Sequence, residues 1–257
     1  MNARRLYIAW LTLTRKEVMR VLRIWTQTLL PPAITMGIYF VVFGSFLGGQ
    51  IRSVGQFPYI QFILPGLVMM TCITNSFSNV ASSFFSAKFQ RNIEELLISP
   101  VPGWIMVSGY VAGGIVRGLL CGLIVAAVGL LFTHIPLYNP LLIMFYLVSS
   151  ASLFSLAGLL NGLLAKKFDD ISIIPTFILT PLTYFAGVFY SINLLPPTWH
   201  TISLANPIFY MVDGFRYGFL GIHDASLSVG VVLLLVLNVA FFAICLDLVK
   251  RGVGLRS

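Results

Sequence analysis

Long apolar runs with almost no charged side chains constrain this sequence more than any other feature. A helix needs roughly 20 such residues, at about 1.5 Å each, to cross a bilayer hydrocarbon core of about 30 Å. Six runs are long enough, and turn signals or charged residues separate them: residues 27–48, 58–85, 103–132, 141–164, 171–193 and 227–248. The sequence therefore predicts a chain that crosses a membrane six times.

Composition supports a membrane protein made of helices. Of the 257 residues, 58% are hydrophobic and 9% are charged, whereas soluble domains are about one quarter charged. Lipid cannot satisfy exposed backbone groups, so a spanning segment must be a helix or part of a closed barrel. Barrel strands alternate between apolar and polar residues, but the runs here are continuous. We therefore expect an all-α membrane protein in which residues 1–257 form a single domain.

Lysine and arginine residues are distributed unevenly between the two sides of the predicted membrane domain, and cytoplasmic loops retain such residues. On one side lie Arg4, Arg5, Arg15, Lys16, Arg20, Arg23, Lys88, Arg91, Lys166, Lys167, Lys250, Arg251 and Arg256, and on the other lie Arg52 and Arg216. This asymmetry predicts that both termini are cytoplasmic. The net charge of +8 follows from topology, and no solvated basic face is available for nucleic acid.

Residues 204–222 test the number of crossings because they are also apolar and rich in aromatic side chains. The segment contains Asn206, Pro207, Asp213 and Arg216. Counting it as a seventh crossing would place the basic C-terminus on the outside, against the charge rule. We expect a re-entrant or interfacial segment that dips into the membrane from the outer side, between the fifth and sixth spans.

The first 25 residues alternate apolar and basic side chains at approximately helical spacing. The apolar set is Leu6, Trp10, Leu13, Val18, Val21, Leu22 and Trp25, and the basic set is Arg4, Arg5, Arg15, Lys16, Arg20 and Arg23. Such a segment is typical of an amphipathic helix held at the inner leaflet by tryptophans and anionic membrane lipids. A basic tail that only sets topology would carry the same charges. The length favours a defined interface helix that could also touch a partner.

A short charged segment, residues 88–99, joins the second and third spans. Phe89, Ile93, Leu96 and Leu97 recur at helical spacing with charges between them, and two prolines follow. A helix of this kind at the cytoplasmic face fits a groove on a soluble protein and could transmit its movement. The alternative is a solvated surface loop.

Several predicted spans carry weakly polar residues. The second span places Thr71, Asn75, Ser78 and Ser82 on one helical face with Asn79 beside them. Small and polar residues let membrane helices pack closely and form hydrogen bonds, which we favour over a surface that lines a substrate path. In the fifth span, the two prolines at positions 175 and 181 predict a kinked or broken helix.

Charged residues inside the membrane need a partner or access to water. Arg117 lies 13 residues beyond Trp104, about 20 Å along a straight helix, so either a structural ion pair or a place in the transport path would explain it. Asp213 and Arg216, three residues apart, are expected to form a local pair that makes insertion of their segment tolerable.

No residue cluster in the sequence predicts catalysis or a bound cofactor. The histidines are isolated in outer loops, no H-E-x-x-H motif is present, and the pair Asp169 and Asp170 lacks further spaced carboxylates. The three cysteines lie in apolar runs and are expected to be core residues. No Gly-Lys dipeptide occurs, so no phosphate-binding loop is present. Any nucleotide energy must come from another chain.

Five sequence segments together resemble one known family over almost the whole chain. They are FQRNIEELLISPVP (residues 89–102), GLLNG (158–162), FDDI (168–171), NPIFY (206–210) and GFRYG (214–218). The chain resembles the ABC-2 family of bacterial exporter permeases. The first segment is moderately specific, and the combination is strong.

The resemblance implies an interface helix, six spans, a coupling helix after the second span, and re-entrant helices between the fifth and sixth. In this family two permease subunits pair with two soluble ATPase subunits that bind ATP and Mg²⁺. The resemblance places the ATPase contact at residues 88–99, with a lesser contact at residues 166–170, and it implies the bacterial inner membrane, a homodimer and export. The candidate coupling residues are Lys88, Arg91, Glu94, Glu95 and Leu96.

Two other function classes are weaker. An ion- or proton-coupled secondary carrier would need acidic residues deep in the membrane, and none of the eight acids lies deep in a predicted span. An intramembrane enzyme would need clustered histidine, cysteine or carboxylate residues at that depth.

Overall fold

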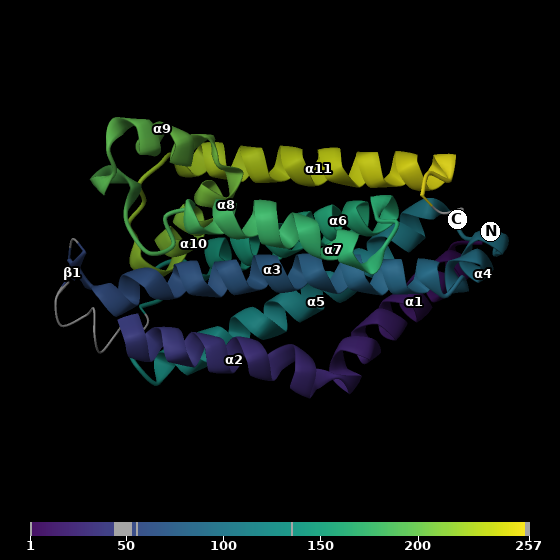
Figure 1. Ribbon diagram of the computed structural model, residues 1–257, viewed down its shortest axis with the longest axis horizontal. Helices are drawn as coiled ribbons and strands as arrows, with labels where there is room; N and C mark the ends of the chain where they lie inside the picture. Colours follow the sequence, from purple (N-terminus) through teal and green to yellow (C-terminus); the bar gives the residue numbers. More distant parts are fainter. Residues whose placement is uncertain (1, 44–52, 55, 135, 255–257) are drawn as a thin grey trace.

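A computed structural model of the chain describes residues 2–43, 53–54, 56–134 and 136–254, and most of these residues are helical (Figure 1). The end of the first expected span, residues 44–48, lies outside the described residues. So does Arg52, one of the two basic residues expected on the outer side.

Four long apolar helices lie along the long axis of the molecule (Figure 1): α3 (Tyr59–Phe89), α5 (Gly103–Leu130), α6 (Pro140–Leu164) and α11 (Leu227–Arg251). Among the described residues, these four are long and apolar enough to cross a membrane. The shortest have 25 residues, which gives about 37 Å of helix against a hydrocarbon core of about 30 Å. The chain is therefore a multi-pass membrane protein built mainly from helices.

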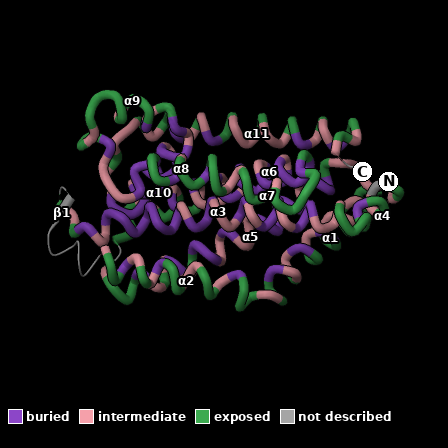
Figure 2. The backbone as a smooth tube through the Cα atoms, viewed as in Figure 1, coloured by how far each residue is buried: buried purple, intermediate pink, exposed green. Residues whose placement is uncertain are grey.

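Helix α3 is the centre of the bundle, and α11 is on its outside. The apolar stretch of α3 is 72% buried, whereas that of α11 is 17% buried, and Figure 2 shows the same contrast. The exposed side chains of α11 include Val229, Val232, Val236 and Val239. An exposed face made of branched apolar side chains is suited to contact with lipid acyl chains.

Small residues set the close packing of the central helices. A Cβ atom at Gly158 of α6 would collide with the carbonyl oxygen of Phe77 in α3. Helix α11 is held to α6 by a hydrogen bond from Asn238 Nδ2 to the carbonyl oxygen of Ser149, at 3.0 Å. Both contacts are typical of helix pairs that associate inside membranes.

Helix α2 (Trp25–Val41) runs beside the long helices but has only 17 residues. Pro31 and Pro32 lie inside it, and proline has no N–H with which to bond the carbonyl four residues earlier. The carbonyl oxygen of Thr28, which would pair with the N–H at position 32, accepts from Cys121 Sγ of α5 at 3.5 Å instead. A carbonyl group left free by the prolines thus forms a contact between α2 and α5.

The fifth expected span, residues 171–193, is interrupted and shorter than expected. It consists of α7 (Phe168–Ile174), a π-helical turn η2 (Pro175–Leu179) and α8 (Thr180–Tyr184). The turn begins at Pro175, as the proline pattern predicts, and the free carbonyl of Ile171 accepts from Asn161 Nδ2 at 3.0 Å.

The continuous helix expected to reach residue 193 ends earlier, because α8 stops at Tyr184. Gly187 has a left-handed backbone with φ +69°, and its carbonyl accepts a hydrogen bond from Arg216. A short 3₁₀ helix, η3 (Ile192–Leu194), follows. The turn is therefore fixed by an arginine that is distant in sequence. The apolar residues around the turn do not predict this contact.

Residues 204–222, expected to dip into the membrane, contribute to two helices that meet at Asn206. Helix α9 (Pro197–Ala205) precedes it, and α10 (Pro207–Leu220) follows with the Asn206 side chain capping its first turn. Helix α10 is mostly buried. Its 14 residues give about 21 Å, which is less than the hydrocarbon core.

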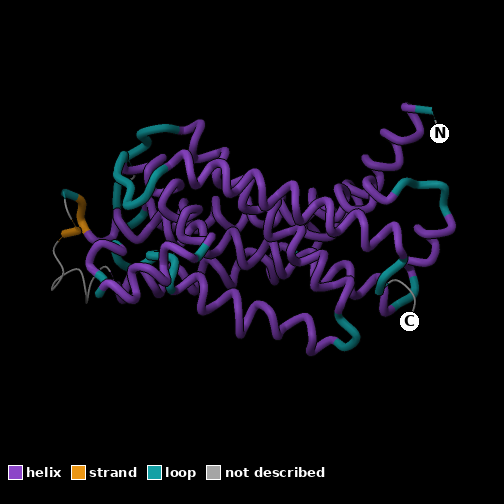
Figure 3. Tube along the Cα trace, turned by 90° about the horizontal axis from the view of Figure 1, so that it is seen from above, coloured by secondary structure: helices purple, strands orange, loops and turns teal. Residues whose placement is uncertain are grey.

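The two ends of the molecule differ. The chain termini and α4 (Asn92–Ile98) lie at one end, while α9 and the short antiparallel pair β1 (Ser53–Val54) and β2 (Phe57–Pro58) lie at the other (Figure 1). Seen from above, the start of α1 (Ala3–Arg23) projects from the bundle near the same end as the C-terminus (Figure 3). The loops gather toward the two ends.

Candidate functional site

Helix α4 forms the exposed tip of the end that carries both termini. It begins after Arg91, whose backbone is left-handed with φ 61°, and it ends at Ile98, two residues before Pro100. Ile93 is only 1% exposed and packs into the core, while the neighbouring carboxylates of Glu94 and Glu95 are exposed. The helix is therefore fastened by one face and presents an acidic face.

Large apolar side chains flank this acidic face. Phe89 is 64% exposed just before α4, and Ile98 is 86% exposed at its end. An apolar contact surface next to fixed charges is typical of a protein interaction site. We call residues 89–98 the α4 platform.

Of the candidate coupling residues, Lys88 is engaged inside the chain. Its Nζ donates to the carbonyl oxygens of Leu163 at 2.9 Å and Ala165 at 2.7 Å. Carbonyl groups at a helix C-terminus lack intrahelical partners and attract cations. Lys88 thus caps α6, whereas Arg91 and the two glutamates are on the surface and Leu96 is half-buried.

The loop before α7 lies against the α4 platform. The rings of Phe85, Phe89 and Phe168 form a cluster in which Phe168 lies 4.9 Å from each of the other two, measured between ring centroids. Edge contacts of this kind are favourable between aromatic side chains. The structure therefore brings together the two loops expected to face a partner.

A carboxylate fixes the backbone of that second loop. Asp170 Oδ2 accepts from the backbone N–H groups of Lys166 at 2.8 Å and Lys167 at 2.9 Å. These hydrogen bonds hold the pKa of Asp170 below its usual range. The cap is therefore formed at neutral pH and is lost only as the pH falls through that lowered value.

Helix α1, which covers most of the expected interface helix, is bound to α3 by a polar network that sequence reasoning missed. The buried carboxylate of Glu17 accepts from Ser83 Oγ at 2.6 Å and pairs with Arg20 at 3.2 Å. Arg20 also donates to Asn79 Oδ1 at 2.8 Å. One signal was available, because Glu17 lies between Leu13 and Val21 at four-residue spacing on the face that proves to be buried.

Helix α1 also crosses α5 at two glycines one turn apart. A Cβ atom at Gly113 would lie 2.6 Å from Glu17 Cβ, and one at Gly109 would lie 2.6 Å from a methyl group of Leu13. Such small-residue spacing lets helix backbones approach closely. The interface helix is thus packed on protein along one face, while Tyr7, Ile8 and other side chains remain exposed on another.

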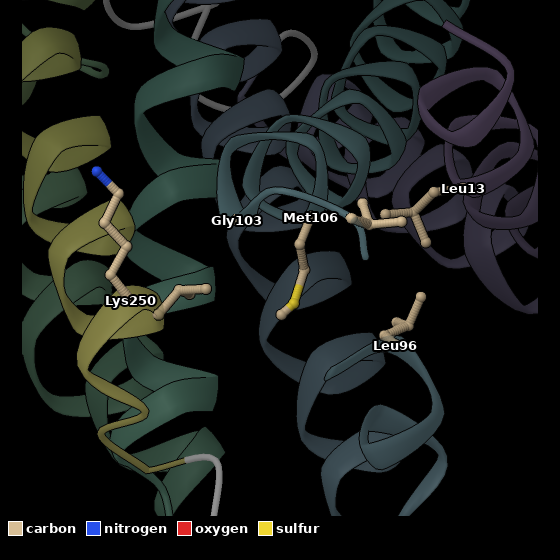
Figure 4. Close-up of a pocket in the computed structure, with 7 residues that line it drawn as sticks. Leu13, Leu96, Gly103, Met106 and Lys250 are labelled. Atoms are coloured by element: carbon tan, nitrogen blue, oxygen red, sulfur yellow. The ribbon is translucent and has the colours of Figure 1, made fainter. Parts of the chain in front are cut away.

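A cavity of about 150 Å³ lies where α4 meets the rest of the protein (Figure 4). Leu96 lines it from α4, Leu13 from α1, Met106 from α5 and Val249 from α11. Its lining is mainly apolar. The α4 platform therefore packs incompletely against α1, α5 and α11.

Three of the candidate pathway residues lie along one side of α3. Arg117 Nη2 of α5 is 3.4 Å from Asn75 Oδ1, and one turn further along α3, Asn79 pairs with Arg20. The polar face of α3 thus meets two arginines from two other helices.

Asp213 and Arg216, expected to form a local pair, make no direct hydrogen bond or ion-pair contact with each other and have other first partners. The Asp213 carboxylate accepts from the backbone N–H groups of Asp224 at 2.8 Å and Ala225 at 3.0 Å, just before α11. Arg216 instead donates to Gly187 O, and its guanidinium lies 3.9 Å from the centroid of the Phe62 ring. Each charge finds a partner in a different loop, because those loops converge at this end of the molecule.

Sequence reasoning also missed Asp224, which organises the loops at this end. Its carboxylate accepts from Ser191 Oγ at 2.7 Å and Asn193 Nδ2 at 2.9 Å. Its backbone N–H is one of the donors to Asp213. Together the two acids join α10, the 3₁₀ turn and the start of α11.

Comparisons with known proteins agree with this architecture. A sequence model of the family described as ABC-2 type transporter matches residues 8–220. The inner membrane transport permease YadH of Escherichia coli (strain K12) is 55% identical over 251 residues, which cover 98% of each chain. Nodulation protein J of Rhizobium leguminosarum bv. viciae is 24% identical over 247 residues, or 94% of each chain, and that of Neorhizobium galegae is 22% identical over 241 residues, or 92% of each. The resemblance is confirmed, and the chain belongs to the ABC-2 type transporter family.

Proposed function

We propose that this chain is the permease subunit of an ATP-driven exporter in a bacterial inner membrane. Two copies form the translocation path, and separate soluble ATPase subunits bind ATP and Mg²⁺. The family and the name of the YadH relative support a transport permease. The single observation that carries the coupling proposal is the α4 platform, which offers Glu94, Glu95, Phe89 and Ile98 at the tip of the molecule.

Six membrane crossings and cytoplasmic termini complete this proposal. Besides the four long helices, α2 and the segment α7–η2–α8 also lie along the long axis of the bundle (Figure 1). With six crossings, both termini and α4 are on one side, as the arrangement of lysine and arginine requires. The two helices α9 and α10 are then the re-entrant segment from the opposite side.

Force applied to the α4 platform would reach the membrane helices through named contacts. Ile93 and Leu96 pack in the same core cluster as Leu13 of α1, Met106 of α5 and Val249 of α11. The cavity beside Leu96 leaves room for α4 to shift against these helices. ATP changes the balance between inward-open and outward-open states only if it binds one of them more tightly.

A secondary carrier driven by ions or protons remains the competing class. Its best acidic candidate is Asp213, which is buried. That carboxylate is already held by two backbone N–H groups at the start of α11, which is typical of a structural cap. We therefore favour the exporter.

The proposal is tested by reversing the charge of the α4 platform. Glu94→Lys combined with Glu95→Lys is expected to weaken binding of the soluble ATPase by about tenfold or more, because like charges then face each other across the interface. The measurement is recovery of the ATPase with the tagged chain from membranes. Both side chains are exposed, so membrane insertion is unchanged.

The matched control is Asp247→Lys. Asp247 is an exposed acid on α11 that pairs with Arg251 and is not one of the platform residues. This variant should recover the ATPase at the wild-type level. Equal recovery with the doubly reversed variant would reject the platform as the docking site, and transport driven by an ion gradient without ATP would favour the carrier.

A further inference from the structure

A cavity of about 260 Å³ lies beside Arg117 between α2, α3 and α5. Polar side chains form much of its lining: Gln27, Thr28, Thr35, Thr71, Asn75 and Arg117. Gln27 and Thr35 are exposed, so the cavity opens between α2 and α3 onto the surface of the helix bundle. A polar hollow of this kind is poorly matched to acyl chains.

Arg117 lies near the middle of the membrane helix that carries it. It is the fifteenth residue of the 28-residue helix α5, about 20 Å from either end. A guanidinium at that depth is rare, and it normally pairs with an acid or faces water. Its surroundings therefore require an explanation.

The chain gives Arg117 little to bind. Its contact with Asn75 Oδ1 is long, at 3.4 Å, and its buried Nε has no hydrogen-bond partner among the described residues. The buried hydroxyl of Thr71, in the same cavity, also lacks a partner within the described part of the chain. A guanidinium has five N–H donors and no acceptor, so the matching ligand is an oxyanion.

No side-chain carboxylate of the described residues lines the Arg117 cavity. All eight carboxylates are in the described residues, and each is near an end of the molecule or already engaged. Glu17 binds Arg20 and Ser83, while Asp213 caps the start of α11. An anionic partner for Arg117 would therefore come from outside the described part of the chain.

A second polar cavity lies nearer the α4 end. Ser82, Ser83 and Ser86 of α3 line this second cavity of about 240 Å³, together with Lys16, Glu17 and Arg20 of α1, and the Glu17 carboxylate there already pairs with Arg20. Between the two cavities, Asn79 and Asn75 lie one turn apart on α3, each bound to an arginine.

We infer that the Arg117 cavity is a binding site for an oxyanion, a phosphate or carboxylate group. The inference deepens the proposed function, since it names the chemistry of a ligand for the transport path. Only the role of the site in transport rests on the proposed function. Binding of the oxyanion itself does not, because it can be measured on this chain without an ATPase.

Binding is tested on the purified full-length chain in a neutral detergent. Its melting temperature is measured against increasing inorganic phosphate, dihexanoyl phosphatidic acid or dihexanoyl phosphatidylcholine. We expect phosphate or phosphatidic acid to stabilise the wild type, and Arg117→Gln to weaken the apparent affinity by about tenfold to a hundredfold. Protection by both indicates a free anion, and protection by phosphatidic acid alone indicates a lipid headgroup.

Two further variants keep the test decisive. Thr35→Leu narrows the cavity but retains Arg117, and it should cause the same loss even if Arg117→Gln does not fold. Arg251→Gln removes an exposed arginine at the end of α11 and should change nothing. The inference is overturned if neither anion protects the wild type, if phosphatidylcholine protects equally, or if Thr35→Leu and every folded Arg117→Gln sample bind like the wild type.

Discussion

Glu17 shows how one residue can decide whether an amphipathic helix stays on the lipid or docks on the protein. Its carboxylate is 1% exposed and depends on Arg20 and Ser83 for partners. A buried ion pair adds little net stability relative to an apolar pair, but breaking it leaves a buried charge without a partner. The network therefore fixes the position of α1 more than it adds to total stability.

Removing the cation of this pair should destabilise the protein. We expect Arg20→Gln to lower the melting temperature in detergent, by an amount equivalent to about 2 kcal/mol, because Arg20 is partly exposed and the full penalty for a buried charge is reduced. Arg23→Gln, an exposed neighbour on the same helix, is the control.

A double variant separates the charge effect from lost packing. Adding Glu17→Gln to Arg20→Gln removes the unpaired carboxylate and should recover part of the loss. If Arg20→Gln and Arg23→Gln melt at the same temperature, the network does not hold α1 in place.

Local sequence pattern could not assign the partners of these residues. Glu17 and Ser83 are 66 positions apart, and Lys88 bonds carbonyl groups 75 and 77 positions away. Lys88 therefore resembles a free surface charge in the sequence, whereas in the structure it caps α6. The same holds for Asp213, whose spacing from Arg216 suggested a local pair while its donors come from the loop before α11.

At the scale of elements, the crossing of α1 over α5 links the α4 end to the membrane helices. Gly113 brings the two backbones together, since its missing Cβ leaves the space that Glu17 fills. Leu13, one turn earlier on α1, lines the cavity beneath α4. Movement of α4 would thus reach α1 and α5 at the same place.

A methyl group at Gly113 should separate these two helices. Gly113→Ala places a carbon 2.6 Å from Glu17 Cβ, so α1 must shift, and we expect faster hydrogen–deuterium exchange of the α1 amides. Gly122→Ala on the same helix is the control, because its nearest neighbour would be 3.5 Å away, an ordinary contact. Equal exchange in the two variants would contradict the account of this crossing.

Elements with strong periodicity or clear stop signals were predictable from sequence. The expected interface helix corresponds to α1, the charged segment before Pro100 contains α4, and Pro175 begins the π-helical turn. The end of the fifth span was not predictable, because the turn at Gly187 depends on Arg216. Among the described residues, four helices meet the length and hydropathy of a membrane span, since α2 contains two prolines and α7–η2–α8 is divided.

At the scale of the whole molecule, apolar sides separate two polar ends with different character. One end carries the chain termini and α4 (Figure 1), with Lys88 and Arg91 beside α4 and Lys250 and Arg251 in the last turn of α11. At the other end, Asp213 and Asp224 tie the loops together. This polarity is suited to a protein that receives force at one membrane face and responds at the other.

The α4 platform is the point at which the account is most directly tested. A photo-reactive amino acid placed at position 98, where the native side chain is 86% exposed, should form an adduct with a soluble ATPase in cells. The same group at Leu137, 64% exposed in the loop between α5 and α6, should form none. An adduct at position 98 is the predicted result, whereas no adduct there, or one only at position 137, would contradict it.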